Sequence, residues 1–304
     1  MGAVLGVLVA AAGAFPGFSQ SQAVRIAVHT SLDGEDDAAG RSYIDAVRFA
    51  IEEANESGIG PHIEIDTYDD KGTEQGARTA AEKIAASQAL VVVGPLFSTS
   101  SVAAGPGFEK AGIASIVAAS ESDRVTDAET TFQSTFKNSD LGVAYAGYLR
   151  YALNGRRAAV IFVDNAYGRT LAGGFRRGAE WLGITETFHG FASAEARDQA
   201  VRQVVADPEK PVAVLGMLQN DAWAAIMALR RQGFAQAILG GTDISDTAFT
   251  APFRSEPEEQ RERNFFSHAL FEAAPVMLDS ANAQTLEFVD RCRKRHGEDQ
   301  TRSS

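Results

Sequence analysis

The sequence predicts an α/β protein with two doubly wound, Rossmann-like lobes joined by a hinge, and three observations support this prediction. Short apolar runs rich in Val and Ile alternate with segments of helical periodicity, the pattern of buried parallel strands with crossover helices. The length of 304 residues suits two domains, and 45% hydrophobic with 22% charged residues is ordinary globular composition. A polar stretch at residues 120–138 separates two such series.

The first lobe is expected over residues 24–137. Its strands are predicted at residues 24–28, 63–68, 89–93 and 113–118, and its third helix begins near Ser98. The first two helices are recognised by apolar side chains at helical spacing, which would cover a sheet. These side chains are Tyr43, Val47, Ala50, Ile51 and Ala54 in the first helix, and Ala77, Ala80, Ala81, Ile84 and Ala85 in the second.

The second lobe is expected over residues 138–265, followed by a return segment toward the first lobe at residues 266–304. Its strands are predicted at residues 158–163, 212–217 and 237–239, and its helices begin near Ser139, Tyr167, Ala194 and Asp221. Ligands of open α/β sheets bind outside the carboxyl ends of the strands. Two facing lobes would therefore form a ligand-binding cleft between them.

Residues 1–23 are predicted to be a signal peptide. No charged residue occurs from Gly2 to Gly17, and the apolar run is too short to span a bilayer. Ser21-Gln22-Ala23 supplies a small-x-small cleavage site, so we expect export and a periplasmic location for the mature chain. The alternative is a buried N-terminal helix, because no basic residue precedes the apolar run. No membrane span is expected in the mature chain.

Composition and motifs argue against several classes of function. The net charge of -12 disfavours binding to nucleic acid or anionic lipid. One cysteine, Cys292, excludes an internal disulfide, and one Cys with five His residues forms no zinc-site spacing. Phosphate-binding, dinucleotide, zinc-protease and serine-hydrolase motifs are absent. We therefore expect no enzyme activity, no metal and no cofactor.

Five segments in order resemble the type I solute-binding proteins of ABC transporters, in the branch that binds Leu, Ile and Val. The segments are VRIAVHTSLDGEDDAAGRSYIDAVRFAIEEANESG, IEIDTYDDKGTEQGARTAAEKI, LVVVGPLFSTSS, GIASIVAASESDRVTD and AAVIFVDNAYGRTLAGGF. The resemblance implies the fold of a type I periplasmic binding protein, with two lobes that close over a ligand. It also implies that further elements follow in relatives, so we expect a C-terminally truncated member.

Ser98 and Thr99 open a helix directly after a predicted strand. Free backbone N–H groups and the helix dipole favour an anion there, and hydroxyl side chains add donors. The resemblance implies that Ser98 holds a ligand carboxylate. Ordinary capping by a Ser/Thr-rich turn is the alternative.

The other site residues rest on the resemblance. It implies that Ala119 offers a carbonyl, and Ser120 a hydroxyl, to a ligand ammonium group, although Ser122 could take the hydroxyl role and Glu121 could pair with a cation. Tyr167 would close over the ligand with its flat apolar face and hydroxyl, and the alternative is an aromatic residue at the helix start that packs against the preceding loop.

Asp243 lies near the position where relatives place an acid against the ammonium group, and its alternative is a turn aspartate. Asp69 and Asp70 look like paired catalytic carboxylates but are better explained as a strand-to-helix turn with an aspartate cap.

These observations together predict the solute-binding component of an ABC importer. It would capture an amino acid or a related small carboxylate or amide by hinge closure, and its partners would be an ABC permease and its ATPases. The alternative is a ligand-sensing module of a receptor or regulatory protein with the same fold.

Overall fold

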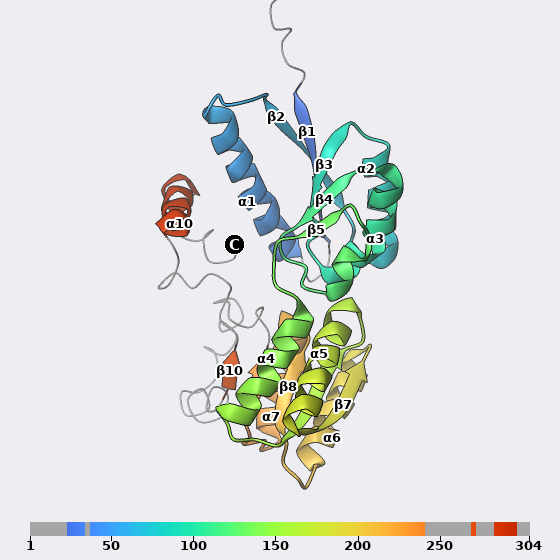
Figure 1. The fold of residues 1–304 in the computed structure, drawn as a ribbon, viewed down its shortest axis with the longest axis vertical. Helices are drawn as coiled ribbons and strands as arrows, with labels where there is room; N and C mark the ends of the chain where they lie inside the picture. The colour runs from blue at the N-terminus through green and yellow to red at the C-terminus, as the bar shows by residue number, and fades with distance from the viewer. Residues whose placement is uncertain (1–22, 34–36, 241–268, 272–282, 297–304) are drawn as a thin grey trace, which may run out of the picture.

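Two parallel sheets form the two lobes in the computed structural model, which describes residues 23–33, 37–240, 269–271 and 283–296 (Figure 1). The first sheet has the strand order β2-β1-β3-β4-β5, and the second has the order β10-β9-β8-β6-β7. The predicted α/β class with two doubly wound lobes is therefore confirmed. The predicted division between residues 137 and 138 falls between the last strand of the first sheet and the first strand of the second.

The first lobe contains the elements up to residue 133. They are β1 (Val24–Thr30), α1 (Asp37–Glu56), β2 (Ile63–Asp69), α2 (Glu74–Ala85), β3 (Ala89–Val93), α3 (Ser98–Ala111), β4 (Ala114–Val117), the 3-10 helix η2 (Asp123–Asp127) and β5 (Thr131–Gln133). Helices α2 and α3 cover one face of the sheet and α1 lies on the other face (Figure 1). The core under α2 and α3 joins Ala27 and Val92 of the strands to Ile84 and Phe108 of the helices.

Two predicted details of the first lobe need correction. In α1 the buried apolar side chains include Ile44 and Phe49, whereas the predicted stripe residue Ala50 is exposed. The inner face of α2 is as predicted for Ala77, Ala80, Ala81 and Ile84, but Ala85 at its end is exposed. Both errors have the same cause. The spacing of apolar residues predicts which face of a helix packs on the sheet, but it fixes the buried positions only to within one residue.

The second lobe contains α4 (Asn138–Tyr151), β6 (Arg157–Val163), α5 (Ala166–Leu182), β7 (Thr185–Phe191), α6 (Ala194–Ala206), β8 (Val212–Gly216), α7 (Gln219–Arg231), β9 (Ile238–Gly240) and β10 (Ala269–Phe271). Strand β6 is buried on both faces, since Ala158 and Val160 pack with α4 and α5 while Ala159 and Ile161 pack with α6 and α7. This explains its continuous apolar sequence.

Strand β7 was not predicted. It pairs with β6 in register from Arg157↔Thr185 to Val163↔Phe191 at the edge of the sheet. Its sequence TETFHGF mixes polar and apolar residues because an edge strand is only partly covered, so it lacks the apolar run used to recognise the other strands.

The last described helix, α10 (Ala283–His296), lies beside α1 of the first lobe (Figure 1). Arg291 of α10 pairs with Glu53 of α1 at 2.6 Å, and Arg295 pairs with Glu56. These pairs tie the segment after β10 to the first lobe. Within the described ranges no helix has the length and apolarity needed to cross a bilayer.

Candidate ligand-binding site

In each sheet the strand order reverses at one boundary between neighbouring strands. A helix that carries predicted site residues follows one of the two strands at that boundary. In the first sheet this is the boundary between β1 and β3, and in the second it is the boundary between β6 and β8. Such switch points open a crevice at the carboxyl edge of the sheet. Helix α3, which begins with Ser98 and Thr99, follows β3, and helix α5, which contains Tyr167, follows β6.

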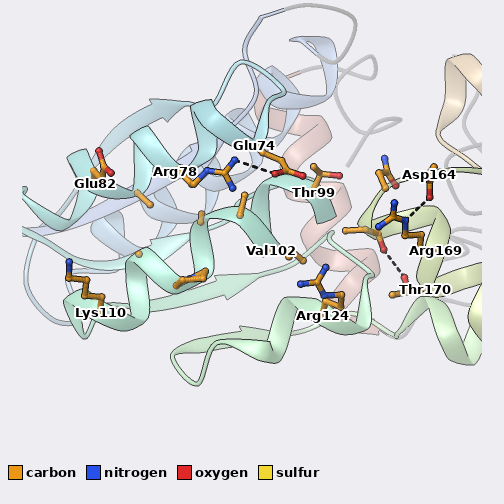
Figure 2. Close-up of a pocket in the computed structure, with 17 residues that line it drawn as sticks. Glu74, Arg78, Glu82, Thr99, Val102, Lys110, Arg124, Asp164, Arg169 and Thr170 are labelled. Carbon is orange, nitrogen blue, oxygen red and sulfur yellow. Dashed lines mark hydrogen bonds and ion pairs between the residues drawn. The ribbon is translucent and has the colours of Figure 1, made fainter. Parts of the chain in front are cut away.

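A cavity of about 640 Å³ lies between the lobes (Figure 2). The first lobe supplies residues from α2, α3 and η2, and the second lobe supplies the β6–α5 connection and the first turns of α5. Its polar lining comprises Glu74, Arg78, Glu82, Thr99, Lys110, Arg124, Asp164, Asn165, Arg169 and Thr170. Of the predicted site residues that the structure describes, Thr99 lines this cavity, whereas Ser98, Ala119, Ser120 and Tyr167 are not in its lining.

Most charges around this cavity are neutralised by neighbours close by in the chain. Arg78 pairs with Glu74 at 3.2 Å, and Arg169 pairs with Asp164 at 2.5 Å. Arg124 pairs with Asp127 at 3.2 Å. The Arg169 guanidinium lowers the pKa of Asp164 through its hydrogen bond, which keeps that carboxylate ionised. Most of the charges on the walls are therefore balanced locally, which suits a zwitterionic or neutral polar ligand better than a highly charged one.

The start of α3 borders this space. Its N-cap residue, Phe97, makes no side-chain cap, so no side chain at that position accepts the N–H groups of the first turn. Thr99 stands in this turn and lines the cavity. A carboxylate placed here would meet backbone donors, a hydroxyl and the positive end of the helix dipole.

Ser98 is buried and its hydroxyl is bonded within its own lobe. Its Oγ accepts the backbone N–H of Glu121 at 3.2 Å and that of Ser122 at 3.1 Å. A serine hydroxyl can accept two hydrogen bonds and still donate one. Ser98 thus joins α3 to the segment after β4, and these two bonds do not use its hydroxyl hydrogen.

Ser120 is also buried, and it forms part of a serine and carbonyl cluster. Its Oγ lies 2.7 Å from Ser101 Oγ, 2.9 Å from Leu96 O and 3.2 Å from Pro95 O. These bonds use its hydroxyl to connect the end of β4 with the loop before α3. In contrast, Ala119 is exposed.

The two alternatives to Ser120 are buried as well. Ser122 caps η2 by accepting the N–H of Arg124 at 3.3 Å. Glu121 is 7% exposed, and its backbone carbonyl accepts the N–H of Asn138 at 2.7 Å. Contact between a serine hydroxyl and a ligand ammonium group after β4 thus stays a prediction, for Ser120 or for Ser122.

Tyr167 is buried in the first turn of α5, and this helix has a strong cap. Asn165 Oδ1 accepts the N–H groups of Tyr167 at 3.0 Å and Gly168 at 3.1 Å. Asn165 was not singled out in the sequence, although an Asn just before an apolar helix is a common capping signal. Asp243 lies outside the described residues.

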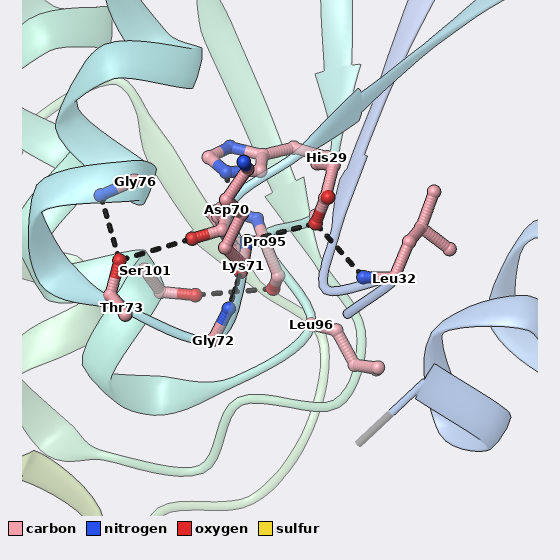
Figure 3. Close-up of polar contacts among 12 residues, drawn as sticks. His29, Leu32, Asp70, Lys71, Gly72, Thr73, Gly76, Pro95, Leu96 and Ser101 are labelled. Carbon is pink, nitrogen blue, oxygen red and sulfur yellow. Dashed lines mark hydrogen bonds and ion pairs between the residues drawn. The ribbon is translucent and has the colours of Figure 1, made fainter. Parts of the chain in front are cut away.

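The predicted turn at Asp69 and Asp70 is present, but its helix cap is a different residue. Thr73 caps α2 by accepting the N–H of Gly76 at 2.9 Å (Figure 3). Asp69 accepts the N–H groups of Leu32 and Lys71. The aspartates bond the loop after β1 and the turn itself, so an aspartate cap on α2 was the wrong prediction.

Asp70 is fully buried and pairs with the fully buried His29 at 3.3 Å (Figure 3). Burial alone would raise the pKa of Asp70, but the close contact with His29 and the hydrogen bond from the Gly72 N–H lower it overall. The pair links β1, the β2–α2 turn and α3. Sequence reasoning missed it because its partners lie on separate elements.

Comparisons with known proteins identify relatives over most of the chain. A family model described as periplasmic binding protein matches residues 23–304. An amino acid binding protein from Pseudomonas aeruginosa is 25% identical over 226 residues, 72% of this chain and 60% of that protein. A Leu/Ile/Val-binding protein from Rhizobium johnstonii is 22% identical over 75% of this chain and 64% of that protein. The chain thus spans under two thirds of these relatives' length.

Among solved structures, the fold is similar to LivJ, the substrate-binding protein of a branched-chain amino acid transporter from Streptococcus pneumoniae, in complex with isoleucine. The TM-score is 0.77 at 22% identity, covering 93% of this chain and 80% of that chain.

Proposed function

Because the chain belongs to the periplasmic binding protein family, we propose that it captures an amino acid or a related small carboxylate or amide between its lobes and presents it to an ABC permease. This family consists of binding proteins, in agreement with the expectation that the chain is not an enzyme. The observation that carries the proposal is the interlobe cavity, because its walls come from both lobes and a ligand there would favour the closed arrangement.

The proposed contacts place the ligand carboxylate at the start of α3. Thr99 and the first-turn N–H groups would receive it, with the remaining hydrogen of Ser98 as a further donor. Tyr167 would close from the second lobe. The ammonium or amide end would meet the carbonyl of Ala119, with Ser120 and Asp243 retained as candidates for this end.

Export and transport belong to the same proposal. The uncharged run at residues 2–17 supports a cleaved signal and a periplasmic location. Mass spectrometry of the chain purified from the periplasmic fraction would test this, and a mature protein that retains residues 1–23 would contradict it.

Calorimetry with a panel of amino acids, small amides and carboxylates tests ligand capture. We expect one chemical class to bind, and Thr99→Asp to weaken that binding at least tenfold, because the new carboxylate would repel the ligand carboxylate. The same change should preserve stability, since an acidic residue is favourable in the first turn of a helix. Ala194→Asp is the matched control, because it adds the same carboxylate at an exposed position in the first turn of α6, away from the cavity lining.

Absence of binding across the panel would contradict the proposal. Binding by the chain together with undiminished uptake in a strain that lacks it would favour the ligand-sensing alternative over transport.

A further inference from the structure

One residue at the connection between the lobes is hydrogen-bonded to both. Asn138 begins α4 and is 0% exposed. Its backbone N–H donates to Glu121 O at 2.7 Å in the first lobe. Its side-chain Nδ2 donates to Tyr167 O at 3.2 Å in the first turn of α5. The backbone of Asn138 is thus anchored in one lobe and its side chain in the other.

The first lobe also caps the helix that Asn138 begins. The N-cap residue of α4, Lys137, makes no side-chain cap. The carboxylate of Asp123, in η2, instead accepts the backbone N–H of Ser139 at 3.0 Å. A carboxylate at a helix N-terminus satisfies a donor and complements the dipole. The start of α4 is therefore held to the first lobe at two successive N–H groups.

Helices α4 and α5 are packed so closely that they must move together. A Cβ added at Gly142 would lie 2.3 Å from Leu171 O, and one at Gly174 would lie 2.1 Å from Ser139 O. Only glycine permits such contact between two backbones. A change in the angle of α4 at Asn138 would consequently be transmitted to α5 and its first turn.

One atom of the Asn138 side chain is buried at a cost in free energy. Its Oδ1 is buried and has no hydrogen-bond partner among the described residues. A buried amide oxygen without a partner is unfavourable, so the bond from Nδ2 to Tyr167 O must contribute something that an apolar side chain would not.

We propose that Asn138 is a positioning residue that fixes the orientation of the second lobe on the connection, and with it the place of Tyr167 opposite α3. The inference rests on the proposed function, in which lobe closure captures the ligand. Asn138 would act through this orientation without touching the ligand.

Interlobe distances measured without ligand test the inference. Spin labels attached at Lys83→Cys on α2 and Trp181→Cys on α5, in a Cys292→Ser background, report the separation of the lobes by pulsed electron paramagnetic resonance. Both labelled side chains are exposed. We expect Asn138→Ala to broaden the distance distribution or add a second population. Ser139→Ala is the matched control, because it changes a neighbouring buried side chain and leaves the backbone bond to Asp123.

The outcomes separate positioning from simple stability. If Asn138→Ala lowers the thermal midpoint but keeps the distance distribution of the Ser139→Ala control, the inference is overturned. If Asn138→Ala does not unfold cooperatively, Asn138→Asp decides, because it keeps the size of the side chain and replaces the donor facing Tyr167 O with an acceptor. An unchanged distribution in Asn138→Asp would likewise overturn it. Since no ligand is added, a failure of the calorimetric panel would count against the proposed function alone.

Discussion

Substitution of Ser98 distinguishes a residue that only touches ligand from one that also holds the first lobe together. In Ser98→Ala, the buried N–H groups of Glu121 and Ser122 lose their shared acceptor. A buried donor left unsatisfied costs about 1–3 kcal/mol. The two bonds are long, at 3.1 and 3.2 Å, so we take the lower end of this range for each and expect a total loss of about 2 kcal/mol.

The assay is thermal and urea unfolding in the absence of ligand, followed by calorimetry with the ligand. A loss of about 2 kcal/mol in the free energy of unfolding lowers the thermal midpoint by roughly 4–8 °C for a protein of about 150–250 residues. Thr99→Val is the matched control, because Thr99 is half-buried at the cavity wall and should change stability by less than about 0.5 kcal/mol. If Ser98→Ala weakens binding but leaves unfolding unchanged, Ser98 does not hold the first lobe together, and its two accepted bonds contribute nothing to stability.

Three more substitutions each test a single contact or surface. Gly174→Ala should abolish or strongly impair folding, because the new Cβ would lie 2.1 Å from Ser139 O, whereas Gly173→Ala meets open space and should fold normally; equal midpoints in circular dichroism would refute the close packing of α4 and α5. The lowered pKa of Asp70 means that its ionised form stabilises the fold above the ordinary carboxyl pKa of about 3.9 and that this contribution is lost as the pH falls below it. Asp70→Asn should therefore flatten the dependence of urea stability on pH between about 5 and 2, and an unaltered slope would count against the pairing with His29. Ile116 and Phe132 are 44% and 58% exposed and lie in register on β4 and β5, so replacing both with Thr should reduce binding of an apolar fluorescent dye without lowering the midpoint; undiminished fluorescence would place the apolar surface elsewhere.

The sequence by itself determined the elements whose signal is local. Val- and Ile-rich runs marked the buried strands. The helix starts at Ser98 and Ala194 agree with the structure because helical periodicity, and at Ala194 also the Ser193 cap, act within a few residues. Strand β7 was missed because partial burial at a sheet edge leaves a mixed sequence. The line of burial on α1 was misplaced for a related reason, since packing against the sheet decides it.

The tertiary structure alone decided how the site segments bond to one another. Ser98 meets the backbone of residues 121 and 122, Ser120 meets Ser101, and Asn138 joins Glu121 to Tyr167. The side-chain bonds among these join residues that are 19 to 29 positions apart in the chain. The residue type determines which hydrogen bonds a hydroxyl or amide can donate or accept. Its partner depends on the order of the strands and on which helices lie close together, and these are properties of the fold.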